Sequence, residues 1–229
     1  MKKKMSKRYK KIVEVDNNNK SLQLDEIITS VKKNCTTKFD ESIDISLSLA
    51  NKQKKDEFNL RTVVNLPNGN GKKIKIAVLC EESKEIEAKN AGAEIFGSEK
   101  LISDITSGKI NFDKLIATPS MMSKMGKLGK ILGPKGLMPN PKLGTVTNNI
   151  ESAVKALKSG QVEIKNDKDG NLGLSIGKKN FPNNKIKENF DALIQTIIKE
   201  KPTGIKGDYI QSAFLTSTMG ISFKVKLEK

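Results

Sequence analysis

Two periods of apolar residues run along the chain and predict its helices and strands. Between Ile43 and Leu49 every second residue is apolar, which predicts a strand with one buried face. From Leu24 to Val31 the apolar residues recur at helical spacing behind the acidic pair Asp25 and Glu26, which predicts a helix. The same criteria predict further strands over residues 58–66, 162–164, 172–176, 209–216 and 221–227, and a helix over 186–197.

The middle of the chain follows a different pattern. Residues 74–80 form a short apolar run with little alternation, which is typical of a buried strand of a parallel sheet. Helices and strands are then predicted in alternation, with helices over 86–91, 98–108 and 149–158 and strands over 94–96 and 115–117. Alternation of this kind with short connections predicts a parallel α/β sheet.

Strands with alternating apolar residues, typical of antiparallel sheets, are predicted at both ends of the chain, which suggests that these ends fold together. We therefore expect an α/β protein of two domains. Residues 1–67 and 160–229 would form a split α+β sandwich domain, and residues 68–159 an inserted Rossmann-like parallel-sheet α/β domain. The two connections, near Pro67–Gly71 and near Gly160, would act as a hinge. The first ten residues are expected to form a disordered basic arm.

Positive charge narrows the range of partners. The chain has 42 Lys and Arg against 26 Asp and Glu, a net charge of +16. Such a field favours nucleic acid first and an anionic membrane surface second, the plain alternative being a soluble protein with a lysine-rich surface. Only Arg8 and Arg61 are arginines, and aromatic residues make up 4%. We therefore expect a folded RNA or a duplex, recognised by shape and phosphate backbone.

Several classes of site lack their usual residues. The chain has no histidine, the commonest general base and metal ligand, and no phosphate-binding P-loop motif, so we expect no enzyme, no cofactor and no metal site. Cys35 and Cys80 are expected to be buried and reduced. The basic start leads into no apolar core and no run could span a bilayer, so we expect a cytoplasmic protein with no membrane partner.

Residues 118–147 are the least ordinary segment. They hold four of the seven prolines, five lysines and no acidic residue. A rigid loop of glycine, proline and lysine suits phosphate. An amphipathic helix through Met121, Met125, Leu128 and Leu132, followed by a structural loop, explains the pattern equally well. The two GxxG matches, at 126–129 and 133–136, are too common by chance to indicate a KH-type RNA-binding loop.

This segment carries a resemblance to a known family. The run GKLGKILGPKGLMPNPKLGTVT at residues 126–147, preceded by Phe112-Asp113 and Ala117-Thr118-Pro119, is similar to the signature of the ribosomal protein L1 family. Further family marks cover almost the whole chain, among them Lys7–Tyr9, Lys38–Ser42, Leu66–Gly69 and Ser217–Gly220. The chain departs from the pattern at Thr62, Lys135 and Ile221, and none of these departures removes a charge.

The resemblance implies a large-subunit protein of the ribosomal side stalk whose split domain binds large-subunit rRNA. It implies these rRNA-binding positions: Glu26, Lys38, Phe39, Ser42, Ser212, Thr216, Thr218, Met219 and Gly220. Lys165 and Lys168 are candidate phosphate contacts beside them. The plain alternatives are a core position for Phe39, ordinary strand hydroxyls, and a solvated face for the two lysines.

The resemblance also implies a role for the inserted domain. Lys127, Lys130, Lys135 and Lys142 would face the tRNA leaving the exit site, with the protein a monomer within the ribosome. The family further implies repression of translation by binding its own operon mRNA. The rival hypotheses are an enzyme acting on a phosphorylated substrate, and a general basic nucleic-acid-binding or membrane-surface protein without ribosomal specificity.

Overall fold

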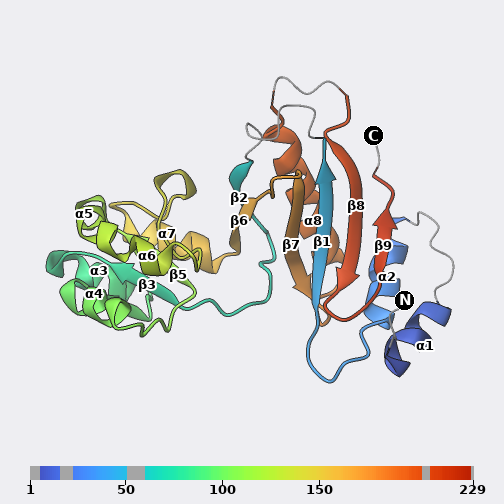
Figure 1. Ribbon diagram of the computed structural model, residues 1–229, viewed down its shortest axis with the longest axis horizontal. Coiled ribbons are helices and arrows are strands. Elements are labelled where there is room, and N and C mark those ends of the chain that lie inside the picture. Colours follow the sequence, from blue (N-terminus) through green and yellow to red (C-terminus); the bar gives the residue numbers. More distant parts are fainter. Residues whose placement is uncertain (1–5, 16–22, 51–59, 203–206, 228–229) are drawn as a thin grey trace. The chain divides into compact units, whose positions relative to one another are not determined.

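The computed structural model describes residues 6–15, 23–50, 60–202 and 207–227. The chain forms two compact units (Figure 1). Residues 1–71 and 162–229 form the split unit, and residues 72–161 form the inserted unit. The first contains an antiparallel sheet and the second a parallel one, so the predicted fold class is confirmed.

The main sheet of the split unit has four strands in the order β7-β1-β8-β9. Their bounds are Ser42–Leu49 for β1, Asn171–Lys178 for β7, Ile210–Ser217 for β8 and Ser222–Val225 for β9. All three pairings are antiparallel. Segments from the two ends of the chain therefore lie side by side, because β1 is hydrogen-bonded to both β7 and β8.

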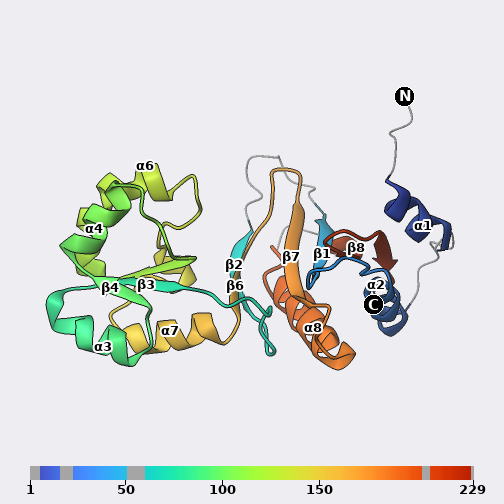
Figure 2. The same ribbon diagram turned by 90° about the horizontal axis from the view of Figure 1, so that it is seen from below.

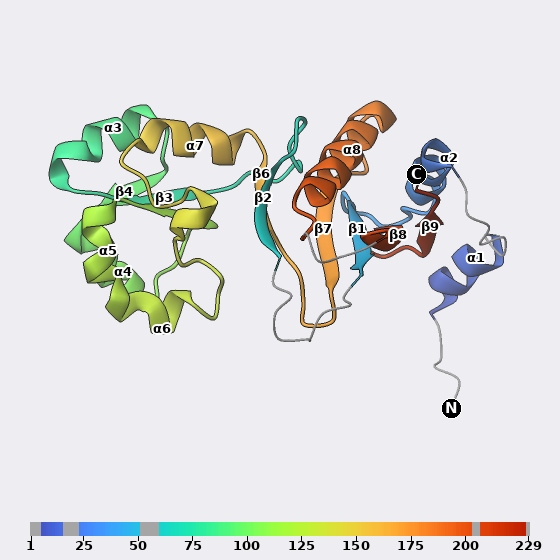
Figure 3. The same cartoon turned by 90° about the horizontal axis from the view of Figure 1, so that it is seen from above.

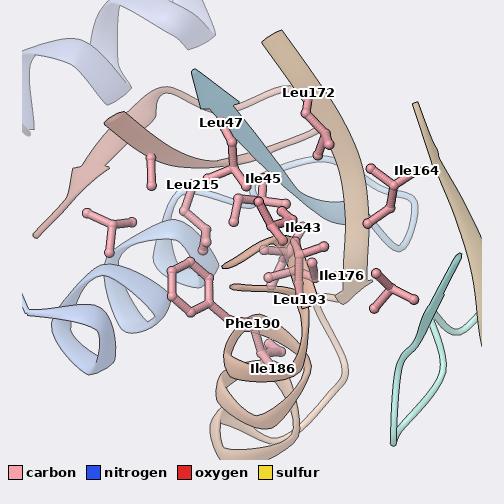
Figure 4. Packing of buried hydrophobic residues seen from close by; sticks show 14 of the residues in the cluster. Ile43, Ile45, Leu47, Ile164, Leu172, Ile176, Ile186, Phe190, Leu193 and Leu215 are labelled. Atoms are coloured by element: carbon pink, nitrogen blue, oxygen red, sulfur yellow. The ribbon is translucent and has the colours of Figure 1, made fainter. Parts of the chain in front are cut away.

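Two helices, α2 (Leu24–Lys33) and α8 (Asn183–Lys199), pack on one face of this sheet (Figure 2). The alternation that predicted β1 explains why, because Ile43, Ile45 and Leu47 point to the face that the helices cover and are at most 2% exposed. Figure 4 shows them packed against Ile186, Phe190 and Leu193 of α8. The opposite face of β1 carries the polar residues that alternate with them.

A smaller sheet joins β2 (Arg61–Asn65) to β6 (Gln161–Lys165). Val64 and Ile164 contribute to the same core as the main sheet. The strand predicted over 58–66 corresponds to β2, which ends at residue 65, one residue earlier than predicted. Residues 58 and 59 lie outside the described residues.

The prediction of a disordered basic arm is wrong for residues 7–10, which begin helix α1 (Lys7–Val15). The many lysines favoured a disordered interpretation, but the helix has an apolar side on which Ile12 is buried, at 5% exposed. Arg8 also donates hydrogen bonds to residues distant in sequence, described below. Residues 1–5 lie outside the described part of the chain.

The inserted unit is built on a three-stranded parallel sheet in the order β4-β3-β5. The strands span Ile76–Leu79 (β3), Ile95–Gly97 (β4) and Lys114–Ala117 (β5), and the helices Glu85–Asn90 (α3), Glu99–Thr106 (α4) and Ile150–Lys158 (α7). Successive residues of β3 belong to two different cores, one on each face. Figure 3 shows α3 and α7 over one face and α4 over the other. Both faces are covered, which explains the continuous apolar run.

Two further expectations concern single residues. In the helix predicted over 86–91, α3 leaves Ile86 73% exposed, while Ala88 is fully buried. Cys35 and Cys80 are both free and buried, as expected. Among the described residues, no helix is long and apolar enough to cross a membrane, and no group of His, Cys, Asp and Glu could hold a metal ion.

Candidate nucleic-acid interface

Two of the predicted rRNA-binding residues, Ser42 and Thr218, meet where β1 begins and β8 has ended. The Thr218 N–H donates to the Ser42 carbonyl at 3.1 Å, and the Ser42 N–H donates to Thr218 Oγ1 at 3.0 Å. Thr218 Oγ1 also donates to the Ser42 carbonyl at 3.3 Å. The hydroxyl proton of Thr218 is therefore directed at the protein backbone, and this side chain joins the two segments.

The segments on either side of this contact, residues 36–42 and 217–220, are called here the loop pair. It carries two large apolar side chains in water, Phe39 at 54% and Met219 at 48% exposed. Lys38 and Thr218 are exposed beside them. The alternative that Phe39 is a core residue is therefore wrong. Exposed apolar groups beside a lysine suit contact with a sugar or a base next to a phosphate.

A buried carboxylate, Glu41, holds the loop pair together. Its Oε1 accepts hydrogen bonds from the Thr37 N–H at 3.2 Å and the Thr37 hydroxyl at 2.8 Å, and its Oε2 accepts the Met219 N–H at 3.1 Å. Burial by itself raises the pKa of Glu41, but the hydroxyls of Thr37 and Ser217 and the backbone N–H groups of Met219 and Thr37 outweigh it and lower the pKa overall. Glu41 is therefore ionised at neutral pH, although its accessible surface is zero.

Basic side chains also bind the loop pair from within the protein. Arg8 donates from Nη2 to the Met219 carbonyl at 2.7 Å and from Nη1 to Thr36 Oγ1 at 3.1 Å. Lys178 donates to Ser42 Oγ at 3.0 Å. Sequence reasoning missed the roles of Glu41 and Arg8. Both residues lie within family marks, at Lys7–Tyr9 and Lys38–Ser42, but the sequence does not show what their side chains contact.

The turn after β8 leaves no room for a side chain at Gly220. Its N–H donates to the Ser217 carbonyl at 3.2 Å, and a Cβ added to Gly220 would overlap Ser217 Oγ. Ser217 is itself buried, at 3% exposed. Thr216, the residue before Ser217 in β8, donates its hydroxyl to the carbonyls of Ser217 and Ile221 at 3.1 and 3.2 Å. The turn is thus closed by its own backbone and by a strand hydroxyl.

Other predicted rRNA-binding residues lie at the opposite end of the sheet. Ser212 is paired with Ser48 near the far end of β1. Five residues of strand lie between Ser212 and Thr218, which places the two roughly 20 Å apart. Glu26, on the first turn of α2, lines the same hollow as Val225, the last residue of β9, and Lys226, which follows it. The structure therefore divides the predicted positions between two ends of one sheet.

Lys165 and Lys168 belong to the same far end. They flank the start of the turn at residues 166–170, which leads into Asn171, the other strand partner of Ser48. Asp167 fixes this turn, since its Oδ1 accepts the N–H groups of Asn171 at 2.6 Å and Asp169 at 3.0 Å. These hydrogen bonds, the Asn171 N–H first, lower the pKa of Asp167. Both lysines are exposed, Lys165 at the end of β6 and Lys168 within the turn.

The lysine-rich segment of the inserted unit has a buried apolar side and exposed lysines. Residues 119–132 form a run of short helical turns: η2 (Pro119–Met121), α5 (Met122–Met125), η3 (Gly126–Leu128) and α6 (Gly129–Leu132). Met121, Met125, Leu128 and Leu132 are buried beneath them, as the amphipathic alternative predicts. Lys127, Lys130, Lys135 and Lys142 are all exposed, the last within η4 (Pro141–Leu143).

Comparison with known proteins gives matches over the same span. The model of the Ribosomal protein L1p/L10e family matches residues 31–221. The large ribosomal subunit protein uL1 of Pelagibacter ubique is 57% identical over 225 residues, which cover 98% of each chain. The large ribosomal subunit protein uL1c of Phaeodactylum tricornutum is 47% identical over 225 residues, again 98% of each chain.

Proposed function

Since the chain belongs to the Ribosomal protein L1p/L10e family, we propose that it is a structural constituent of the large ribosomal subunit whose split unit binds large-subunit rRNA. Identity of 57% across 98% of a large-subunit protein carries this proposal. The family is structural and not enzymatic. The protein would act within the ribosome, as a monomer.

Two surfaces of the split unit would contact the RNA. The loop pair offers Phe39 and Met219 for apolar contact and Lys38 for phosphate. Ser212, Lys165, Lys168 and Glu26 would contact RNA at the far end of the sheet. An RNA that reaches both ends must present a fixed shape across roughly 20 Å, which supports recognition of a folded element over a single strand.

Binding to a fragment of large-subunit rRNA, measured against competitor tRNA and duplex DNA at several salt concentrations, tests this proposal. We expect a preference for the rRNA fragment that persists as salt rises, because non-specific binding weakens in proportion to the phosphates neutralised. Equal binding to all three polyanions would overturn the proposal and favour a general basic nucleic-acid-binding protein.

We further propose that the inserted unit faces tRNA leaving the exit site through Lys127, Lys130, Lys135 and Lys142. Replacing all four with glutamine should weaken tRNA binding and reduce the slope of log affinity against log salt by up to about four phosphate contacts. Affinity for the rRNA fragment should stay near wild type. A matched variant with Lys72, Lys73, Lys89 and Lys109 replaced, also exposed on this unit, should retain the tRNA slope.

The protein would also repress translation of its own operon. A messenger segment folded like the rRNA element would occupy the same two surfaces of the split unit, so the two RNAs would compete for them. This part of the proposal rests on the family resemblance.

The turn at Gly220 offers a test of the loop pair itself. Gly220→Ala should reduce affinity for the rRNA fragment about tenfold, because the new Cβ would overlap Ser217 Oγ and displace the neighbouring Met219. Removing the obstructing hydroxyl in Gly220→Ala/Ser217→Ala should restore the affinity to that of Ser217→Ala alone, which is the matched reference for the double variant. An unrescued double variant would mean that the overlap is not the cause.

A further inference from the structure

Arg8 and Glu41 hold the two polar groups of one backbone residue, Met219. Glu41 Oε2 accepts its N–H at 3.1 Å, and Arg8 Nη2 donates to its carbonyl at 2.7 Å. An anion meets the donor and a cation meets the acceptor, so both hydrogen bonds are charge-assisted and stronger than their neutral equivalents. The backbone of an exposed residue is thereby fixed on both sides.

The same two side chains reach the other segment of the loop pair. Arg8 Nη1 donates to Thr36 Oγ1 at 3.1 Å, and Glu41 Oε1 accepts both the N–H and the hydroxyl of Thr37. Thr36 and Thr37 directly precede Lys38 and Phe39. Each charged group therefore connects the segment that carries Phe39 with the segment that carries Met219.

From these contacts we infer that Arg8 and Glu41 are positioning residues that set the RNA-binding conformation of the loop pair without contacting the RNA themselves. The inference rests on the proposed function. Glu41 has no accessible surface and is an anion, so it is unsuited to bind phosphate. The fork of Arg8 is occupied by Thr36 and Met219. Holding the loops in the bound conformation removes an ordering cost from binding.

Positioning has a signature that differs from that of a phosphate contact. Specific binding needs the loop pair in one shape, whereas non-specific binding depends on the number of phosphates neutralised. Glu41→Gln removes a negative charge and places an amide N–H₂ where the carboxylate accepts hydrogen bonds. Affinity for the rRNA fragment should fall about tenfold, while affinity for duplex DNA stays the same or rises. The salt slope for rRNA should not change.

Arg8→Lys separates positioning from charge at the second residue. Lysine keeps the positive charge but replaces the planar fork with a single ammonium group. A phosphate-binding Arg8 would be rescued by lysine, whereas a clamp on Thr36 and Met219 would not. We expect Arg8→Lys and Arg8→Ala to lose similar rRNA affinity, about fivefold or more. The double variant Arg8→Lys/Glu41→Gln should lose less than the product of the single effects, because both act through Met219.

The experiment measures all variants on the full chain, with Glu94→Gln, an exposed residue of the inserted unit, as the matched charge control. Far-ultraviolet circular dichroism checks folding, and Arg8→Lys at a half-buried position carries the test should Glu41→Gln fail to fold. A wild-type protein that prefers the rRNA fragment and a Glu41→Gln or Arg8→Lys variant that matches it would overturn the inference alone. A wild-type protein without that preference would overturn the proposed function.

Discussion

Replacing Asn189 with leucine should destabilise the split unit by about 3 kcal/mol, because three backbone groups lose their hydrogen-bond partner together. Asn189 is fully buried on α8. Its Nδ2 donates to the carbonyls of Gly69 at 2.8 Å and Ile176 at 2.7 Å, and its Oδ1 accepts the N–H of Asn68 at 3.1 Å. Leucine has nearly the same shape but no polar atom, so it leaves these groups unsatisfied.

Urea denaturation followed by tyrosine fluorescence measures this effect, because both tyrosines, Tyr9 and Tyr209, belong to the split unit and the chain has no tryptophan. Gln195→Leu, at an exposed position of the same helix, is the control and should change stability by less than about 0.5 kcal/mol. Asn189→Asp keeps an acceptor for Asn68 but sets an oxygen against two carbonyls, so it should be at least as harmful. Equal stability of the leucine variant and its control would contradict this account.

Periodicity predicted most elements of the fold because burial on one face leaves a repeat in the sequence. The strand at Ile43–Leu49 and the helix behind Asp25 are found within a residue or two of their predicted places. Asn189 breaks the apolar stripe of α8 at a buried position, and a polar residue there is a signal that sequence reasoning can use. It indicates a hydrogen-bonded group but does not show that Asn68 and Gly69 are its partners.

The contacts within the loop pair could not be predicted from the sequence. Glu41 and Met219 are 178 residues apart, and only the pairing of β1 with β8 brings them within hydrogen-bonding distance. Arg8 lies in a stretch so rich in lysine that composition favoured disorder over a helix. Thr218 follows the end of β8, and the sequence does not show that it bonds to the Ser42 backbone. Each of these contacts is tertiary.

The double variant Thr218→Val/Met219→Ala should reduce affinity for the rRNA fragment about a hundredfold, the largest loss expected from any change that leaves the net charge constant. Valine matches threonine in shape but lacks the Oγ1 that bonds to both backbone groups of Ser42, so the junction of the two loops loosens. Alanine removes the Met219 side chain, 48% of whose residue surface is open to contact. Equilibrium binding at fixed salt measures the loss.

Single lysine replacements are the controls for this double variant. Lys38→Ala and Lys168→Ala each remove one phosphate contact at most, which is worth about fivefold in affinity near physiological salt. Their effect should extend to duplex DNA and shrink as salt rises, because it comes from released counterions. The loss in Thr218→Val/Met219→Ala should be confined to the rRNA fragment and persist at high salt. If the lysine variants lost as much as the double variant, RNA binding would depend on charge, and the loop pair would not be its centre.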